Sequence, residues 1–165
     1  MVNPRTLDSL GHAKGKFIPK NSAKYKGKLP IVFRSTWELA FMRMCDLTPG
    51  VESWGSESTV IEYMDPTVAG TPKRRRYFVD FNMTVRTTGG TVMKYLIEIK
   101  PKSQTIPPPP PKPVGGVISD RTKATYNNAV LMYRRNMAKW TAATKAAKSK
   151  GMKFLVLTED RLFKR

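Results

Sequence analysis

Residues 77–100 read YFVDFNMTVRTTGGTVMKYLIEIK, and the fold can be worked out from this stretch. Two runs rich in β-branched and aromatic residues, Tyr77 to Arg86 and Thr91 to Lys100, flank a turn that contains Gly89 and Gly90. Glycine tolerates the backbone angles of tight hairpin turns, so this pattern is typical of a β-hairpin. We therefore expect two antiparallel strands here.

Alternation along the two strands separates apolar from polar side chains, because successive residues of a strand point to opposite faces. One face is expected to be buried and to carry Val79, Phe81, Met83, Val85, Met93, Tyr95, Ile97 and Ile99. The opposite face is expected to carry Phe78, Asp80, Asn82, Thr84, Lys94, Leu96, Glu98 and Lys100. The sequence thus predicts that Asp80, Glu98 and Lys100 leave the buried face together.

The register of the hairpin brings two carboxylates together. If the turn is centred on Gly89, Asp80 lies directly across from Glu98. Cross-strand neighbours have Cβ atoms about 4.5–5.5 Å apart, and like charges there repel. A divalent metal would relieve this repulsion, and it can also polarise a phosphate and lower the pKa of a bound water. Lys100 could then stabilise charge on the phosphate or orient the water. In the alternative interpretation, Glu98 pairs with Lys94 or Lys100 on a solvated sheet face.

A helix that precedes the hairpin carries a third carboxylate. Ser35 and Glu38 have the spacing of a capping box, and Thr48-Pro49-Gly50 is expected to end the helix. Capping is a sufficient local role for Glu38. Its place on the helical wheel also allows it to point along the surface toward the sheet.

The buried side of this helix follows from its periodicity. Trp37, Phe41 and Met44 recur at helical spacing and predict a buried stripe. Arg43 and Asp46 are expected on other faces.

The rest of the chain predicts a single α/β domain with an N-terminal arm. Residues 59–64 predict a strand, 65–72 a loop, 121–150 a long helix closed by Gly151, and 154–157 a last strand. The order of elements favours a small mixed sheet flanked by helices. Residues 101–119 form a proline-rich insert, with five prolines at 107–111, expected on the surface.

Residues 1–30 are polar and rich in lysine, so the expected organisation is a basic arm over 1–30 and a folded domain over 31–165. One interpretation of the arm is a solvated, partly extended segment. The other is a segment that follows DNA phosphates, with Phe17 and Tyr25 anchoring it to the domain or stacking on bases.

The charge balance narrows the class of partner. There are 30 Lys and Arg residues against 12 Asp and Glu, a net charge of +18, and so basic a protein usually binds nucleic acid. Binding to ribosomes or to an acidic protein is the alternative.

Cys45 is the sole cysteine, which excludes an internal disulfide and a cysteine zinc site, and it is expected in the core. His12 is the sole histidine, so a metal site would use carboxylates, which favour magnesium or manganese. Without a signal segment or membrane span, a cytoplasmic location is expected.

The order of these residues resembles the PD-(D/E)xK nuclease superfamily, in which Holliday-junction resolvases and TnsA-type endonucleases also place a helical Glu before the hairpin. The closer resemblance is to the head-completion nucleases of large contractile-tailed phages. It rests on residues 15–21, 33–38, 54–57, 76–81, 95–102 and 154–160, with Gln104, Asn136, Lys139 and Trp140. Val79 stands where the superfamily's name has proline, which is common in divergent members.

The resemblance implies a restriction-endonuclease-like fold and a division of roles. Glu38, Asp80 and Glu98 would hold one or two Mg²⁺ ions (or Mn²⁺), and Lys100 would be the catalytic lysine. Gln104 and Lys139 would flank the site, and the insert could shape or block the substrate groove. The residues expected to contact DNA are Lys16, Lys20, Arg34, Arg74, Arg75, Arg76, Lys102, Gln104, Asn136 and Lys139.

The leading hypothesis is therefore a metal-dependent deoxyribonuclease, an endonuclease by preference, that acts on DNA in the completion of phage heads. DNA is the expected partner, with portal or head proteins as further candidates, in the host cytoplasm or the virion. One alternative is a non-enzymatic basic virion protein that binds packaged DNA and seals the filled head at the portal. A second is an RNA- or ribosome-binding module, which explains the charge but not the hairpin.

Overall fold

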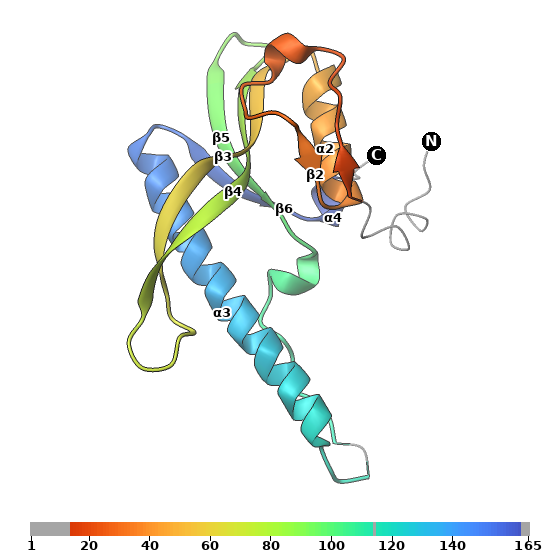
Figure 1. Ribbon diagram of the computed structural model, residues 1–165, viewed down its shortest axis with the longest axis vertical. Helices are drawn as coiled ribbons and strands as arrows, with labels where there is room; N and C mark the ends of the chain where they lie inside the picture. Colours follow the sequence, from red (N-terminus) through yellow and green to blue (C-terminus); the bar gives the residue numbers. More distant parts are fainter. Residues whose placement is uncertain (1–13, 114, 163–165) are drawn as a thin grey trace.

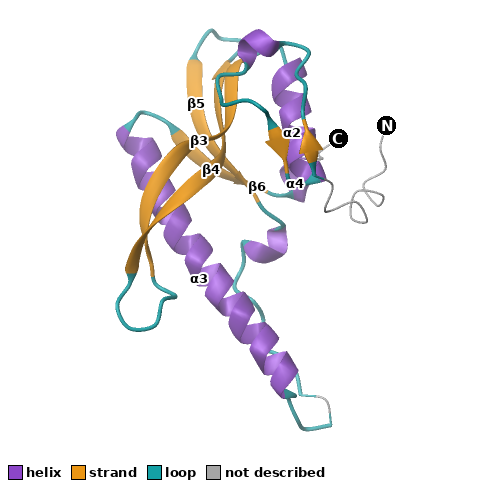
Figure 2. Ribbon diagram, viewed as in Figure 1, coloured by secondary structure: helices purple, strands orange, loops and turns teal. Residues whose placement is uncertain are grey.

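The computed structural model describes residues 14–113 and 115–162. A four-stranded mixed sheet in the order β3-β4-β5-β6 forms its centre (Figures 1 and 2). The strands are β3 (Val51–Asp65), β4 (Lys73–Arg86), β5 (Val92–Ile99) and β6 (Lys153–Leu157). The first three are antiparallel neighbours, and β6 runs parallel to β5. The predicted α/β class with a small mixed sheet is confirmed.

The predicted hairpin is present, with the predicted register. Phe81 pairs with Ile97 and Arg86 with Val92, so both pairs are centred on residue 89. The ladder between β4 and β5 ends at Phe81–Ile97, one step before Asp80 and Glu98. Beyond that step β4 continues with β3, whereas β5 continues with β6. The two strands therefore part at the position of the two carboxylates.

Helices cover both faces of the sheet. On one face lies α2 (Thr36–Leu47), whose Phe41, Met42 and Cys45 pack with Phe81 and Ile97 in a first buried cluster. On the other lies α3 (Asp120–Ser149), whose Ala143 and Ala147 pack in a second cluster with Ile61, Tyr63, Tyr77, Val79 and Leu96. Cys45 is fully buried, as expected.

This arrangement corrects the predicted division of the hairpin into one buried and one solvated face. Val79 packs in the cluster beneath α3, whereas Phe81, two residues later, packs beneath α2. Leu96 and Glu98, expected on the polar face, are 1% and 2% exposed. Alternation within one hairpin cannot reveal that a distant helix covers its second face. The solvated setting of the alternative interpretation is therefore wrong, although Glu98 does pair with Lys100.

The stripe predicted on α2 is also corrected. Met44 is 40% exposed, and the buried side is formed by Phe41, Met42 and Cys45. Asp46, expected on another face, is 2% exposed. Its carboxylate accepts the backbone N–H groups of Lys20 and Asn21 at 2.8 and 2.9 Å. An N-terminal segment covers this side of the helix, and helical periodicity does not show that.

Residues 14–30 lie on the domain. β1 (Gly15–Lys16) pairs with β2 (Val32–Phe33), and the short 3-10 helix η2 spans Ser22–Lys24. The rings of Phe17 and Tyr25 pack on Trp54, with centroids 5.9 and 4.7 Å away. The aromatic side chains thus anchor the described part of the basic segment to the domain. A role of residues 1–30 as a DNA-binding arm stays a prediction.

The remaining elements follow the predictions, except that β3 and β4 are longer than expected: β4 begins at Lys73 and not at Tyr77. The strand expected at 59–64 is the second half of β3, which spans 15 residues and contains a bulge between Ser56 and Thr59. The helix α3 ends where expected, and Gly151 after it has the positive φ of 65° typical of a helix end. Figure 1 shows α3 running past the sheet beside the proline-rich insert, which begins with η3 (Lys102–Gln104). The short α4 spans Glu159–Leu162. No helix in the described part of the chain is long and apolar enough to cross a membrane.

Candidate active site

Asp80 lies where β4 and β5 separate, and its side chain bridges the gap between them. Its Oδ2 accepts the backbone N–H of Ile99 at 2.8 Å. Asp80 can take this N–H because the ladder between β4 and β5 ends before Ile99. Its Oδ1 accepts no hydrogen bond from the described residues. One oxygen therefore fixes the side chain, and the other has no hydrogen-bond partner among the described residues.

Glu98 is held on both of its oxygens. Tyr77 donates its hydroxyl to Oε2 at 2.5 Å, and Lys100 Nζ lies 3.1 Å from Oε1. The Glu98 side chain is 3% exposed and that of Lys100 27%. Lys100 is itself fixed by its backbone N–H, which donates to Leu157 of β6 at 3.0 Å. A buried carboxylate is stable only with such partners.

The charges of these groups act on one another. Burial, followed by the negative charge of Glu98, raises the pKa of Asp80 to about 7, against the opposing effects of Lys100 and the Ile99 N–H. Burial lowers the pKa of Lys100, but Asp80, Glu98 and Glu38 outweigh it and leave that pKa raised. At neutral pH and without a metal ion, Asp80 is therefore only partly ionised, beside a lysine that stays protonated.

Glu38 enters from the first turn of α2. Ser35 caps the helix by accepting the Glu38 N–H at 3.1 Å, as the capping box predicts. The Glu38 carboxylate reaches back to the N–H of Arg34 at 2.8 Å, one residue beyond the usual partner. Its negative charge also contributes to the raised pKa of Asp80. The capping role is thus present, and the side chain is close enough to the hairpin to act on it.

Side chains of α3 approach the site from the other face. Lys139 Nζ lies 5.3 Å from the ring centroid of Tyr77, and burial lowers the pKa of Lys139 although Glu98 opposes the change. Asn136, expected to contact DNA, is 6% exposed, and its amide nitrogen has no hydrogen-bond partner among the described residues. It lines a cavity of about 60 Å³ together with Gln104. Trp140 is buried in the core.

The cations expected to contact DNA, apart from the half-buried Lys139, fall into two groups. Lys16, Lys20 and Arg76 are exposed and form no ion pair with a described residue. The others are paired with acidic side chains: Arg34 with Glu57, Arg74 with Glu62, Arg75 with Asp65, and Lys102 with Asp160. No observation tests their contact with DNA, so these roles stay predictions.

The donor set fits a hard divalent ion with an incomplete protein shell. Across residues 14–113 and 115–162, no three His, Cys, Asp or Glu side chains are already arranged to hold a metal. Mg²⁺ commonly uses one or two carboxylates and completes its shell with water and substrate phosphate. Asp80, with one oxygen that accepts no hydrogen bond from the described residues and a pKa raised by burial and by the charge of Glu98, suits such an ion, with Glu98 beside it.

Comparison with known proteins settles the family. The family model described as "TnsA-like endonuclease N terminal" matches residues 48–159, which is more than half of the chain. The chain belongs to the TnsA-like endonuclease family. A curated relative, the "Head completion nuclease" of Enterobacteria phage T4, is 38% identical over 149 residues, or 90% of this chain and 92% of the relative. No solved structure matches the chain. The resemblance identified in the sequence is confirmed.

The part matched to the TnsA-like endonuclease model contains Asp80, Glu98 and Lys100 but starts after α2, so it does not include Glu38. Sequence reasoning missed Tyr77 and Glu57 in this protein. Tyr77 was identified only as the first residue of its strand, and the structure shows its ring in the cluster beneath α3 and its hydroxyl on Glu98. No spacing pattern in the sequence marks Glu57. It lies in a bulge of β3, where its carboxylate binds Arg34.

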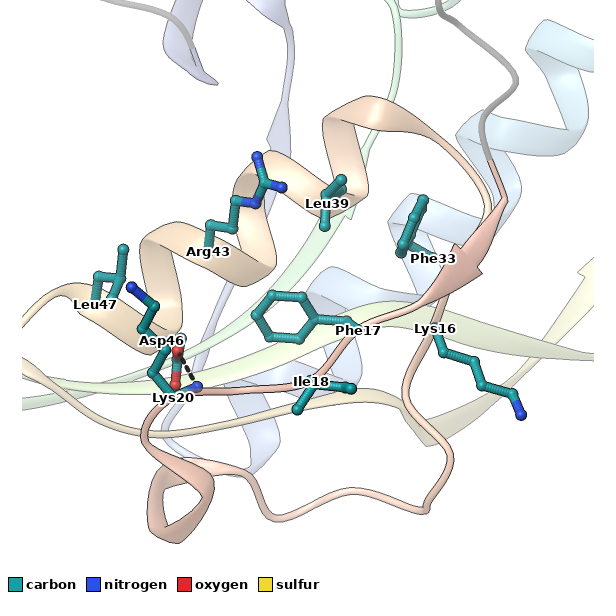
Figure 3. A pocket seen from close by; sticks show the side chains of 9 residues that line it. All are labelled: Lys16, Phe17, Ile18, Lys20, Phe33, Leu39, Arg43, Asp46 and Leu47. Carbon is teal, nitrogen blue, oxygen red and sulfur yellow. Dashed lines mark hydrogen bonds between the residues drawn. The ribbon is translucent and has the colours of Figure 1, made fainter. Parts of the chain in front are cut away.

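A cavity of about 620 Å³ lies elsewhere on the protein, between the N-terminal segment and α2. Figure 3 shows Phe17, Ile18, Phe33, Leu39 and Leu47 around it, with Lys16, Lys20 and Arg43 among them. None of the proposed catalytic residues lines this cavity. The candidate active site is therefore the place where β4 and β5 part, and not this cavity.

Proposed function

We propose that this protein is a metal-dependent DNA endonuclease that hydrolyses phosphodiester bonds. One observation carries the proposal. Asp80, one of whose carboxylate oxygens accepts no hydrogen bond from the described residues, meets the paired Glu98 and Lys100 at the point where two strands of the central sheet part. A structural salt bridge needs no second carboxylate beside it, because that carboxylate raises the free energy of the folded protein.

Asp80 and Glu98 would hold Mg²⁺ or Mn²⁺, and Glu38 would contribute from α2. A divalent ion bound there would polarise the phosphate and make a bound water more acidic. Tyr77 and the Ile99 N–H fix the orientation of the two carboxylates before substrate arrives. Such preorganisation limits the reorganisation needed during reaction.

Lys100 is the residue proposed to stabilise the charge that develops on the phosphate oxygens. Its raised pKa keeps the ammonium protonated at neutral pH, so it acts as a cation and hydrogen-bond donor and not as a base. When DNA and metal bind, Lys100 would shift from Glu98 toward the phosphate. Lys139, half-buried above Tyr77, would add positive charge on the α3 side.

The biological setting is proposed from the relative. The T4 protein is named for head completion, and we infer that this chain likewise acts on DNA in head completion, in the host cytoplasm or the virion. Its net charge of +18 suits a DNA substrate. Portal or head proteins are the proposed protein partners.

The test is a cleavage assay on linear, nicked, branched and single-stranded DNA with Mg²⁺, Mn²⁺ or EDTA. We expect cleavage with either metal, none with EDTA, and a loss of at least 100-fold in the Lys100→Ala variant. Lys94→Ala, an exposed lysine on the same strand, is the matched control and should cleave normally. DNA binding without cleavage on any substrate would instead support the basic protein that seals the filled head.

A further inference from the structure

Glu57 adopts a backbone conformation that an L residue with a side chain rarely takes. Its φ is +47°, and among the described residues it is the one non-glycine position with a positive φ. It lies in the bulge of β3 between Ser56 and Thr59, where the register with β4 shifts. Residues held in this region cost free energy and persist where the surrounding structure requires them.

In this conformation the carboxylate of Glu57 binds both terminal nitrogens of the Arg34 guanidinium. Nη1 of Arg34 donates to Oε1 of Glu57, and Nη2 donates to Oε2 at 3.0 Å. The two side chains are 53% and 45% exposed. A guanidinium has five N–H donors, so this pair leaves three of them for another acceptor.

Arg34 lies just before α2, the helix that carries Glu38 of the candidate site. Its backbone N–H donates to the Glu38 carboxylate at 2.8 Å, and the charges of Glu57, Glu38 and Asp80 raise the pKa of its guanidinium. Arg34 is therefore next to a carboxylate of the candidate site and has donors left for a DNA phosphate bound there. Arginine suits this task because its planar fork binds phosphate in a defined orientation.

We propose that Glu57 is a positioning residue that holds the Arg34 guanidinium at the candidate active site, where Arg34 binds the scissile phosphate of DNA. This inference rests on the proposed function and adds to it a phosphate-binding residue and the residue that orients it.

Stability alone does not explain the pair. An exposed ion pair stabilises a protein little, because water screens it and two long side chains must be ordered. A strained backbone at Glu57 costs at least as much. Stability is therefore not a sufficient reason for the pair, and strain of this kind is typical of functional sites.

The test separates strain from positioning with two substitutions of Glu57. Glu57→Gly removes the carboxylate and also relieves the positive φ, whereas Glu57→Gln removes the charge and keeps the strain. Glu52→Gln is the matched control, because Glu52 pairs with Arg86 on the same strand pair outside the site. Thermal denaturation, the KM and kcat of cleavage, and DNA affinity in EDTA are measured for each variant, together with Arg34→Ala.

We expect Glu57→Gly to melt above the wild type and yet to lose about tenfold or more in kcat/KM, with weaker DNA binding in EDTA. Glu57→Gln should show the same loss without the gain in melting temperature, and Glu52→Gln should cleave as the wild type does. Adding Glu57→Gly to Arg34→Ala should cause no further loss, because the two residues act as one unit.

Two cleavage results would overturn the inference. Normal cleavage by Glu57→Gly, whatever its melting temperature, would show that Glu57 does not position Arg34 for the reaction, and faster cleavage by Glu57→Gln would show that the pair restrains Arg34. If the wild type does not cleave DNA at all, the proposed function fails. The binding measurements in EDTA still decide the inference in that case, because unchanged DNA affinity in both Arg34→Ala and Glu57→Gly would overturn it.

Discussion

The hydroxyl of Tyr77 donates a 2.5 Å hydrogen bond to Oε2 of Glu98, while Lys100 occupies the other oxygen of the same carboxylate. Burial and the adjacent charge of Glu98 raise the pKa of Tyr77, so its hydroxyl keeps its proton and remains a donor at any physiological pH. The buried carboxylate is thereby fixed in orientation from the α3 side of the sheet.

Tyr77→Phe should therefore both destabilise the protein and weaken its metal-dependent activity. Loss of a hydrogen bond to a buried carboxylate costs about 1.5–3 kcal/mol of unfolding free energy. Loss of a group that orients a metal ligand lowers metal affinity or activity about 10–100-fold. Urea denaturation and cleavage against Mg²⁺ concentration measure the two effects. Tyr63→Phe, a buried tyrosine of the same cluster whose hydroxyl bonds no carboxylate, is the control.

Metal binding should be visible without any DNA. An ion that binds the native state alone raises thermal stability by mass action, about 2.7 kcal/mol at a concentration 100 times its Kd. We expect this gain for the wild type with Mg²⁺ or Mn²⁺ and its loss in Asp80→Ala and Glu98→Ala. Lys100→Ala should keep the gain and lose cleavage, because Lys100 is proposed to act on the phosphate. An equal gain in Asp80→Ala would show that the ion binds elsewhere.

The raised pKa of Asp80 makes stability depend on pH. The folded protein binds the Asp80 proton up to a pKa of about 7, whereas the unfolded chain releases it near 4. The folded state thus holds more protons between these values, so the Asp80 contribution to stability falls as pH rises through this window. Melting temperatures between pH 5 and pH 7.5 without metal should decline in the wild type. Asp80→Asn keeps an acceptor for the Ile99 N–H and should show a flatter profile, and a profile as steep as the wild type's would contradict the assignment.

Local patterns were sufficient to predict the hairpin, its register and the long helix α3. Gly89 and Gly90 determine the turn, and the turn determines which residues of β4 and β5 face each other. The position of Asp80 near Glu98 follows from that register and needs no knowledge of the rest of the chain.

The errors arose where distant segments meet. Met44 has the right helical spacing for burial but is exposed, because the N-terminal segment covers the side of α2 that carries Asp46. Glu98 is buried because α3 crosses the second face of the sheet, and the contact of Tyr77 with it arises the same way. Periodicity reports which side of an element is apolar and cannot report which segment will cover it.

The N-terminal segment should contribute to stability through Asp46. This carboxylate accepts two backbone N–H groups, from Lys20 and Asn21, and is 2% exposed. Asp46→Ala leaves both donors without their partner, so we expect a loss of about 2–4 kcal/mol in unfolding free energy. Asp120→Ala, which removes an exposed carboxylate paired with Lys123, is the control and should change stability by less than about 0.5 kcal/mol. A similarly small effect of Asp46→Ala would mean that the segment is not anchored to α2 in solution.

DNA affinity should depend steeply on salt, and the exposed cations should contribute unequally to that dependence. Each phosphate that a Lys or Arg neutralises releases counterions, so the logarithm of the affinity falls linearly with that of the salt concentration. With a net charge of +18 we expect a slope steeper than about −3.

Lys16 and Lys20 form no ion pair with a described residue, whereas Lys102 Nζ lies 2.7 Å from Asp160. Replacing Lys16 or Lys20 by Ala should reduce the magnitude of the slope by about 1 if each binds a phosphate. Lys102→Ala should change it less, because Asp160 already neutralises that charge. Fluorescence titrations of a labelled duplex at several salt concentrations in EDTA measure all three slopes without cleavage. Unchanged slopes for Lys16→Ala and Lys20→Ala would place the DNA on another face of the protein.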